Sequence, residues 1–403
     1  MDELEKRFSL LGVEHAPGQE VNLQAKALDL QGPALAGRKV DFSHGDVDAF
    51  PPPPASKEAF LQGFAEGAAQ AYTEYSGKKA IREQLAADLA AFMGAPVDGD
   101  KGLILTAGTQ GALFLAVNSL LPYGGDIAIV TPDYFANHKL AAFLGATIHA
   151  VPLQYMDDEN RAGLDLQRLE EVFAAGVQVF LFSNPNNPTG AVYSAAEVQA
   201  IGKLAKKYKV AVIVDELYSR QIYEGRTFTH LCAQAERPDT LVTIIGPSKT
   251  ESMSGFRLGC AFGTPAIIER MEKLQAIMTL RAAGYCQPLF RVWFHEGPDF
   301  IPQRVAAHQE IRDALLDLFR KEEGVTVRST NAGSYLFPTL PELTVPIADF
   351  TSIVKELAQV IVTPGTEFGP EWTHSIRLNF SQDKEAAIAA VKRLLVIMNR
   401  YRK

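Results

Sequence analysis

Cysteine is scarce in this chain, which has three cysteines among its 403 residues. Cys232, Cys260 and Cys286 stand far apart, so the sequence predicts neither a disulfide framework nor a zinc site. No other metal site is indicated. We expect buried thiols in a reducing compartment, which favours a cytoplasmic protein.

Long hydrophobic runs are also missing. No stretch approaches the roughly 18 apolar residues that a membrane-spanning helix needs. The first residues, 1–6, are mostly charged and no apolar run follows them, so no signal peptide is expected. The net charge is −8 and no block of basic residues stands out. We therefore expect neither a membrane nor a nucleic acid as partner.

Apolar segments of strand length alternate with helical patterns through the first 285 residues. Strands are predicted at 102–106, 126–130, 177–182, 210–214 and 240–245, and helices at 81–90, 111–117 and 197–208. Such alternation is typical of an α/β fold, in which helices cover both faces of a parallel sheet. We predict a large domain at residues 51–285, which begins with four prolines that favour a stiff, extended connector.

The pattern changes after residue 285. The sequence predicts a helix around 304–308, short strands at 325–327 and 334–337, and a closing helix at 384–400. This mixture indicates a smaller α+β domain at residues 286–403. We expect the N-terminal segment, residues 1–50, to join it, so that both chain ends form the small domain.

Polar clusters follow several predicted strands, at the edge where ligands bind in open parallel sheets. They are Gly108-Thr109-Gln110, the loop 184–190 with Asn187, Asp215 with Tyr218, and Ser248-Lys249 with Arg257. Each also has a plain structural explanation, as a turn, a rigid loop, a helix cap or a solvated charge. A neutral lysine amine, however, can condense with an aldehyde. Arg377 lies in an apolar alternating run, where a buried arginine needs a partner such as a carboxylate.

The combination and order of these clusters are more specific than any one of them. The motifs are N-P-N-N-P-T-G at 184–190, D-x-x-Y at 215–218 and S-K-x-x-x-x-x-x-x-R at 248–257. Over about residues 40–395 the chain resembles the pyridoxal-phosphate (PLP) enzymes of fold type I, the aspartate aminotransferase superfamily, class I/II. The resemblance implies a mostly parallel seven-stranded sheet, PLP as cofactor, and a homodimer with shared active sites.

The resemblance also implies roles for the matching residues. Lys249 forms a Schiff base with the cofactor and moves the Cα proton of the substrate. Asp215 keeps the pyridine nitrogen protonated, so that the ring withdraws electrons. Tyr218 and Asn187 hydrogen-bond the phenolic oxygen of the cofactor, and Tyr134 stacks on its ring.

The resemblance also implies which residues bind the phosphate of the cofactor and the carboxylate of the substrate. The phosphate is held by Gly108, Thr109, Gln110, Ser248 and Arg257, with Tyr72 contributed by the other subunit. The substrate carboxylate is held by Arg377, with help from Asn187 and the backbone near Gly45.

The chain departs from the family pattern at two places. Gly246 stands three residues before the lysine, where family members commonly carry Ser or Thr, so one phosphate hydroxyl is absent or comes from elsewhere. In the loop 43–48, His44 takes an apolar position and Val47 replaces a proline. His44 is therefore either a structural histidine or an additional acid/base beside the cofactor.

The departure at His44 leaves the reaction open. Transamination of a free L-amino acid to the 2-oxo acid, through the Lys249 Schiff base and a quinonoid, is the favoured prediction. The alternative is O2-dependent oxidation or hydroxylation of L-arginine to a 2-keto acid, because that branch of the superfamily resembles this chain in having a histidine here. Asp46 and Asp48 would then pair with the guanidinium. A PLP lyase and an inactive regulator are less favoured.

Overall fold

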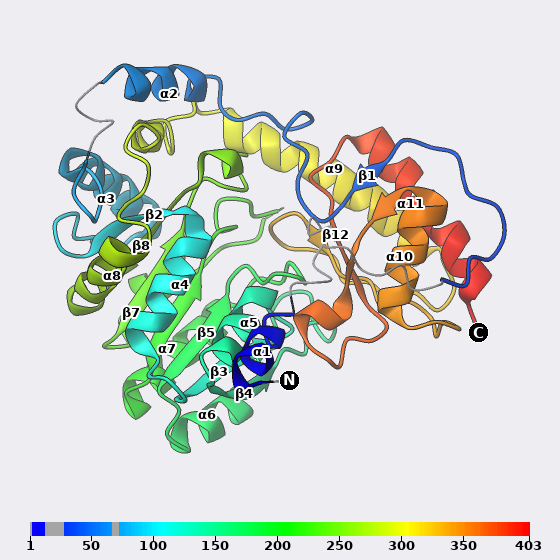
Figure 1. Ribbon diagram of the computed structural model, residues 1–403, viewed down its shortest axis with the longest axis horizontal. Coiled ribbons are helices and arrows are strands. Elements are labelled where there is room, and N and C mark those ends of the chain that lie inside the picture. The colour runs from blue at the N-terminus through cyan, green and yellow to red at the C-terminus, as the bar shows by residue number, and fades with distance from the viewer. Residues whose placement is uncertain (1, 13–27, 67–71, 224) are drawn as a thin grey trace.

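The computed structural model describes residues 2–12, 28–66, 72–223 and 225–403. The chain forms a large domain around one sheet and a smaller domain beside it (Figure 1). The sheet has seven strands in the order β2-β8-β7-β6-β5-β3-β4. Their bounds are β2 Leu103–Ala107, β3 Asp126–Thr131, β4 Thr147–Pro152, β5 Val179–Ser183, β6 Ala211–Asp215, β7 Leu241–Ile245 and β8 Leu258–Gly263.

The sheet is parallel except for β8, which runs antiparallel to both of its neighbours, β2 and β7. This arrangement confirms the predicted α/β fold with a mostly parallel seven-stranded sheet. The five strands predicted for the large domain all form. β4 and β8 were not predicted.

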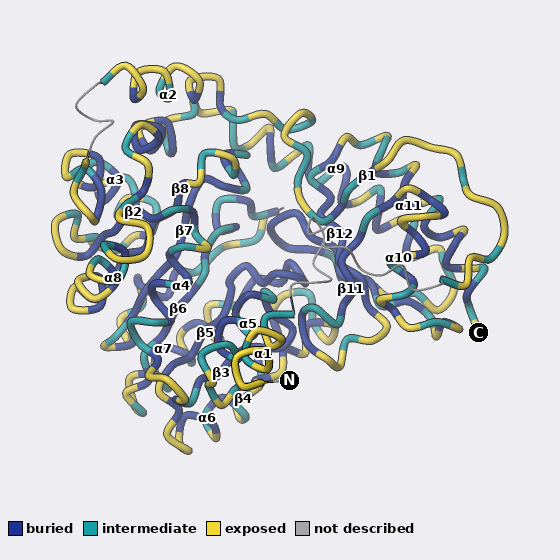
Figure 2. Tube along the Cα trace, in the orientation of Figure 1, coloured by how far each residue is buried: buried dark blue, intermediate teal, exposed yellow. Residues whose placement is uncertain are grey.

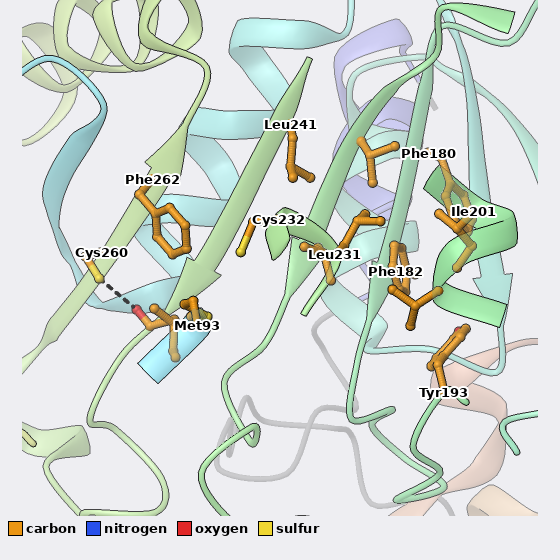
Figure 3. Close-up of a cluster of buried hydrophobic side chains, with 14 of the residues drawn as sticks. Met93, Phe180, Phe182, Tyr193, Ile201, Leu231, Cys232, Leu241, Cys260 and Phe262 are labelled. Carbon is orange, nitrogen blue, oxygen red and sulfur yellow. Dashed lines mark hydrogen bonds between the residues drawn. The ribbon is translucent and has the colours of Figure 1, made fainter. Parts of the chain in front are cut away.

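Helices cover both faces of the sheet, because successive strand residues point to opposite sides. Phe180 and Phe182 of β5 face one core, which also receives apolar residues of α3 (Lys79–Met93), α6 (Leu166–Ala174) and α7 (Ala195–Tyr208). Figure 3 shows both phenylalanines in this core with Ile201 of α7. Val179 and Leu181 face the other core, against α4 (Gly108–Leu120), α5 (Phe135–Phe143) and α8 (Pro265–Met278). The strands are accordingly buried along most of their length, except the edge strand β4, where only Val151 is buried (Figure 2).

Strand β8 is not predicted from the sequence because it contains two glycines, and glycine is depleted in strands. Gly259 has a structural reason. A Cβ at this position would lie 2.4 Å from the backbone nitrogen of Thr109 and 2.5 Å from the carbonyl carbon of Gly108. The absence of a side chain thus lets the turn between β2 and α4 pack directly on β8.

The small domain has its own core, formed by residues from both ends of the chain. β1 (Val40–Asp41) pairs in parallel with β10 (Val360–Ile361). β11 (Thr363–Pro364), β12 (Ile376–Asn379) and β9 (Tyr335–Leu336) form an antiparallel sheet. The helices α9 (Phe300–Arg320), α10 (Ile347–Ala358) and α11 (Lys384–Tyr401) pack around these strands (Figure 1).

One predicted element of the small domain is wrong. The segment 325–327 is not a strand, because Thr326 makes only an isolated bridge to Thr339. The chain leaves this bridge at once, and Arg328 turns toward the carbonyl groups of residues 155–161. Three residues of alternating pattern are too few to indicate a strand without a neighbour that continues the pairing.

The described parts of the first fifty residues, 2–12 and 28–50, contact both domains. Val40 and Phe42 lie in the small core. α1 (Glu3–Ser9) instead packs on α5 of the large domain, where Arg7 Nε donates to the carbonyl oxygen of Phe143 at 3.1 Å and Phe8 lies edge-on to the Phe143 ring. The domain boundaries at residues 50 and 285 stay predictions.

Further along, α2 (Ser56–Ala65) packs against the 3₁₀ helix η4 (Gln287–Arg291).

The three cysteines are buried, free thiols. Cys260 of β8 donates a weak hydrogen bond to the carbonyl oxygen of Ile245 at 3.4 Å (Figure 3). Within the described ranges, no group of three or more His, Cys, Asp or Glu side chains is arranged to hold a metal ion. No helix among the described residues is long and apolar enough to cross a bilayer.

The packing of β8 on the turn yields a stability test. We expect Gly259→Ala to lower the free energy of unfolding by about 1–3 kcal/mol, because the added methyl group overlaps backbone atoms that cannot rotate away. Urea unfolding measures this loss. Gly111→Ala in α4 is the matched control, since its nearest neighbour would be 3.8 Å away. That control should keep or raise stability by up to about 1 kcal/mol. Equal stability of the two variants would contradict the packing argument.

Candidate active site

A pocket lies at the carboxyl edge of the large sheet, where the ends of neighbouring strands meet. Ser183 at the end of β5 is directly opposite Asp215 at the end of β6, and Asp215 is opposite Ile244 of β7. Most of the residues predicted for the cofactor line this pocket. They are Thr109, Gln110, Tyr134, Asn187, Asp215, Tyr218, Ser248, Lys249 and Arg257. Gly108 directly precedes Thr109.

Asp215 is the acidic group of the pocket. Its Oδ1 accepts a hydrogen bond from the backbone N–H of Leu217 at 3.0 Å. Desolvation raises the pKa of this carboxyl to about 6, although the Leu217 hydrogen bond and the cationic Lys249 oppose the rise. At neutral pH the carboxylate is therefore mostly ionised but poorly solvated, and a positively charged ligand atom beside it would be stabilised.

One end of the pocket is suited to an anion. Helix α4 begins there, and its first backbone N–H groups have no partner within the helix, so they are available to an anion. Gly108 has φ +75°, and a Cβ on it would lie 2.4 Å from Nη2 of Arg257. Glycine thus allows both the left-handed turn and the close approach of the guanidinium. Arg257 itself is held by a hydrogen bond from Nη1 to the carbonyl oxygen of Ser254 at 2.9 Å.

The departure at Gly246 has a steric cause at this anion end. A Cβ on Gly246 would lie 3.0 Å from Cγ2 of Thr109 and 3.1 Å from Cα of Gly259. Thr109 therefore occupies the space that a larger residue at position 246 would need. The hydroxyl absent at position 246 has a counterpart in Thr109, which lines the pocket.

A buried carboxylate beneath the pocket fixes two of its walls. Asp133 accepts hydrogen bonds from the backbone N–H groups of Tyr134 at 2.6 Å and Ser183 at 2.9 Å. It also accepts one from the Ser183 hydroxyl, which in turn accepts from the N–H of Asn187 at 3.2 Å. Burial raises the pKa of Asp133 to about 8 despite these bonds. Tyr134 is further oriented by a hydrogen bond from its hydroxyl to Oε1 of Gln110 at 3.0 Å.

Arg377 comes from β12 of the small domain and is only 4% exposed. Its guanidinium donates to Oδ1 of Asn187 at 3.2 Å, the carbonyl oxygen of Ser43 at 3.0 Å and Oγ1 of Thr363 at 3.2 Å. These acceptors are all uncharged, and Nε is buried without a partner. The charge of Arg377 is therefore not neutralised by these contacts, as expected of a site for a carboxylate.

Tyr335 is a polar pocket residue that sequence reasoning missed. It lies on β9 within the predicted strand 334–337, and its hydroxyl accepts a hydrogen bond from that of Tyr218 at 2.8 Å. Nothing in the local sequence distinguishes this tyrosine from a core residue. Its proximity to Tyr218, 117 positions away in the chain, arises only when the small domain packs on the large one.

Arg377 does not itself line the pocket but donates to Asn187, which does. Three further predicted residues, Tyr72, His44 and Gly45, are also absent from its lining. Tyr72 is 79% exposed, with the Arg281 guanidinium 4.6 Å from its ring centre. His44 lines an adjoining cavity that also reaches Lys249, but its side chain is largely exposed, with Nε2 3.6 Å from Asp41. Gly45 lines the same cavity. The backbone group that contacts Arg377 is the carbonyl of Ser43, and no bond from Gly45 to Arg377 is observed.

The donor set fits PLP. Its phosphate needs an anion site, its protonated ring nitrogen needs a carboxylate, and its aldehyde needs an amine. The pocket offers the α4 N-terminus with Arg257, the poorly solvated Asp215, and Lys249. Asn187 and Tyr218 supply polar side chains between these groups.

The raised pKa of Asp215 yields a test on the cofactor-free protein. We expect Asp215→Asn to raise the free energy of unfolding at pH 7.5 by about 1–3 kcal/mol, because the folded state holds this carboxylate less favourably than water does. The gain should be absent below the unfolded pKa of 3.8, grow as pH rises to about 6, and stay constant above. Urea unfolding at pH 5 and 7.5 measures it.

The exposed Asp157→Asn is the control for that experiment and should change stability by less than about 0.5 kcal/mol. An Asp215→Asn variant no more stable than the wild type at pH 7.5 would show that the carboxylate is well solvated.

Comparisons with known proteins agree with this geometry. Residues 38–394 match the family described as aminotransferase class I and II. An aspartate aminotransferase of Pyrococcus horikoshii is 26% identical over 357 residues, covering 88% of this chain and 89% of that protein. An asparagine–oxo-acid transaminase of Streptococcus mutans is 25% identical and covers 99% of this chain and 100% of that protein.

A solved structure extends the comparison to three dimensions. The crystal structure of an aspartate aminotransferase from Rhodobacter sphaeroides has a TM-score of 0.94 and 53% sequence identity. It covers 99% of this chain, which in turn covers 100% of that chain. The chain belongs to the class I and II aminotransferases, and it is a PLP-dependent enzyme that transfers an amino group between an amino acid and a 2-oxo acid.

Proposed function

We propose that the pocket at the sheet edge is the active site of this aminotransferase and that Lys249 binds the cofactor there. The observation that carries the proposal is the convergence of Lys249, Asp215 and the anion end of α4 on one cavity. These three features come from distant parts of the chain. Their meeting satisfies the three charged or reactive groups of PLP at once.

We assign the residues of the pocket to three parts of the cofactor, namely its ring, its phenolic oxygen and its phosphate. Asp215 pairs with the protonated ring nitrogen, and Tyr134 lies against the ring. Tyr218 and Asn187 hydrogen-bond the phenolic oxygen. The phosphate is bound by Gly108, Thr109, Gln110, Ser248 and Arg257. The α4 N-terminus and Arg257 together supply the positive charge that this dianionic group requires.

We infer that Arg377 binds the α-carboxylate of the amino acid. Its guanidinium is buried, and its contacts are with uncharged acceptors, Asn187 among them. A carboxylate would replace weak partners with a charge-assisted, bidentate one. Fixing the carboxylate also orients the Cα–H bond, because only rotation about one bond remains for the substrate.

In the proposed reaction Lys249 acts as the base. When bound, PLP withdraws electrons from the substrate's Cα and so makes its proton acidic. Lys249 would take that proton with its amine and would then give it, from the same nitrogen, to the former aldehyde carbon of the cofactor, so that the amino group stays on the cofactor when the 2-oxo acid leaves. Asp215 keeps its negative charge throughout, and Arg377 keeps the carboxylate in place. The protein thus binds, orients and moves one proton.

The substrate proposed is an L-amino acid of the aspartate or asparagine class, since the relatives described above carry those names. The arginine oxidase alternative gains no support from these relatives. The carboxylate of Asp46, suggested for a guanidinium, already accepts hydrogen bonds from the N–H groups of Asp48 and Ala49. The Asp46 carboxylate thus stabilises the turn formed by residues 46–49. We retain a cytoplasmic location as a prediction from the three free thiols.

We also propose a homodimer with shared active sites. Large apolar side chains are exposed beside the pocket, on the segments around residues 72–75 and 277–285. They are Tyr72, Tyr75, Ile277, Met278, Leu280 and Tyr285, which we call the apolar face. Arg281 joins the two segments through contacts with the rings of Tyr72 and Tyr75.

The position of the apolar face supports a second copy of this chain as its occupant. Tyr285 and Arg257 line one shallow cavity, so the face adjoins the anion end of the pocket. Contiguous exposed apolar side chains beside a binding site are typical of an interface. A partner bound there could bring its own Tyr72 to the phosphate, which accounts for the distance of Tyr72 from the pocket of its own chain.

The reaction is tested by a half-reaction without oxygen. We expect L-aspartate to convert the bound cofactor from its aldehyde to its amine form, as followed by absorbance, and Lys249→Ala to slow this by at least about 10²–10⁴-fold. The exposed Lys203→Ala is the control and should react as the wild type does. Unchanged absorbance across all twenty amino acids would contradict transamination. Oxygen uptake with L-arginine alone, in an electrode, would favour the oxidase instead.

The dimer is tested by mass in solution. We expect a particle of twice the chain mass of 44.0 kDa in light scattering, and a shift toward the single chain in Ile277→Asp, because a buried charge disfavours association. Val396→Asp on α11, also exposed but outside the apolar face, should stay dimeric. A wild-type protein of 44.0 kDa would rule out a shared site.

A further inference from the structure

Tyr335 contacts both halves of the proposed site, yet none of the roles described above is assigned to it. It is buried at 4% exposure on β9, where Asn379 of β12 pairs with it. The Thr330 hydroxyl donates to its carbonyl oxygen at 2.5 Å. The backbone is thus held on both sides, and the side chain extends from the small domain into the pocket of the large one.

The hydroxyl of Tyr335 lies at the cofactor end. It is 2.8 Å from the hydroxyl of Tyr218, and the two rings meet edge to face with centroids 5.4 Å apart. Burial opposes ionisation of Tyr335, but the cations Lys249 and Arg377 and the bond with Tyr218 lower its pKa below the usual tyrosine value. The opposite holds for Tyr218, whose pKa is raised by burial and by Tyr335. The pair is polarised, with negative charge favoured on Tyr335.

The ring of Tyr335 lies at the substrate end. The guanidinium carbon of Arg377 is 4.5 Å from the Tyr335 ring centre and 4.9 Å from that of Phe368. Arg377 therefore lies next to two aromatic rings, an arrangement that favours a cation. The hydrogen bonds to Asn187, Ser43 and Thr363 fix the guanidinium, and the two rings pack against it.

We propose that Tyr335 is a positioning residue that acts on Tyr218 through its hydroxyl and on Arg377 through its ring. This inference rests on the proposed function of the pocket. A hydroxyl can donate one hydrogen bond and accept others. When the two hydroxyls rotate, Tyr335 donates to Tyr218, whose own proton then points to the phenolic oxygen of the cofactor.

The consequence of this chain of hydroxyls is chemical. A tyrosine that accepts a hydrogen bond becomes a stronger donor, because the two bonds polarise each other. Tyr218 would then stabilise negative charge on the phenolic oxygen more strongly. A phenolic oxygen whose negative charge is stabilised in this way attracts less strongly the proton on the nitrogen that joins Lys249 to the cofactor. The Tyr335 hydroxyl should therefore lower the pH at which this nitrogen loses its proton.

Two substitutions separate the hydroxyl from the ring. Tyr335→Phe removes only the hydroxyl. We expect the midpoint of the cofactor absorbance, titrated with pH, to rise by about 0.5–1 pH unit, with KM for the amino acid changed less than about twofold. Tyr335→Leu removes the ring as well, and KM should rise by about 3–30-fold because Arg377 loses one of its aromatic partners.

Two controls complete the experiment. Tyr193→Phe removes another buried tyrosine hydroxyl, one without a partner and outside the pocket, and should leave the midpoint and KM unchanged. In a Tyr218→Phe background, adding Tyr335→Phe should shift the midpoint no further, since the hydroxyl is proposed to act through Tyr218.

The outcomes are distinguishable. A Tyr335→Phe midpoint equal to that of the wild type, or equal KM increases in both Tyr335 variants, would overturn the positioning role. Borohydride reduction followed by peptide mass analysis identifies the cofactor-bearing residue separately. If the wild type does not carry the cofactor on Lys249, the proposed function fails and this inference with it. If it does, a failure of the midpoint test concerns Tyr335 alone.

Discussion

A carboxylate with little water around it requires a positive partner. Asp215 is such a carboxylate, and it lines the pocket. Desolvation raises its pKa to about 6, so its charge at neutral pH is retained at a cost in stability. Asp215 ends β6, which lies between β5 and β7. It therefore lies close to Asn187, which follows β5, and to Lys249, which follows β7. A protonated ring nitrogen beside Asp215 would remove the cost and would at the same time direct the ring toward Lys249. Cofactor binding and folding are thus linked through one side chain.

The charges on either side of Asp215 follow the order of charges in the proposed ligands. Arg257 and the N-terminus of α4 lie at one end of the pocket, and Arg377 lies beyond Asn187 at the other. A phosphate, a ring cation and a carboxylate match this order of positive, negative and positive groups. The first two protein groups come from the large domain, whereas Arg377 and Tyr335 come from the small one. The proposed assignment therefore places the substrate where the domains meet and the cofactor mainly on the large domain.

The sequence predicts what is encoded locally. Lys249, Asp215 and Asn187 each stand in a short motif beside a predicted strand, and five strands follow from apolar runs of the right length. Other features depend on contacts between distant segments. Gly259 of β8 lies where the turn at Gly108 and Thr109 packs on the strand, which no local pattern reveals. Gly246 departs from the family pattern because Thr109 takes its space.

Tyr335 reaches the pocket, and Thr363 reaches Arg377, only through the packing of the small domain. The strand predicted at 325–327 does not form, because its alternating pattern has no partner strand that continues the pairing.

The loop 43–48 shows why an unusual residue need not carry an unusual role. His44 raised the possibility of oxygen chemistry, yet its ring is turned toward Asp41 and its Nδ1 donates to the carbonyl oxygen of Gly45 at 2.9 Å. The loop contributes to the site through the backbone, because Ser43 accepts from Arg377 through its carbonyl oxygen. Gln382 anchors the same loop by donating to the carbonyl oxygens of Asp41 and His44. Backbone groups make these contacts whatever the side chain, so a histidine can replace an apolar residue here without altering how the loop contacts Arg377. The identity of residue 44 is therefore weak evidence for the reaction, and the groups that contact Arg377 and Tyr218 are stronger evidence.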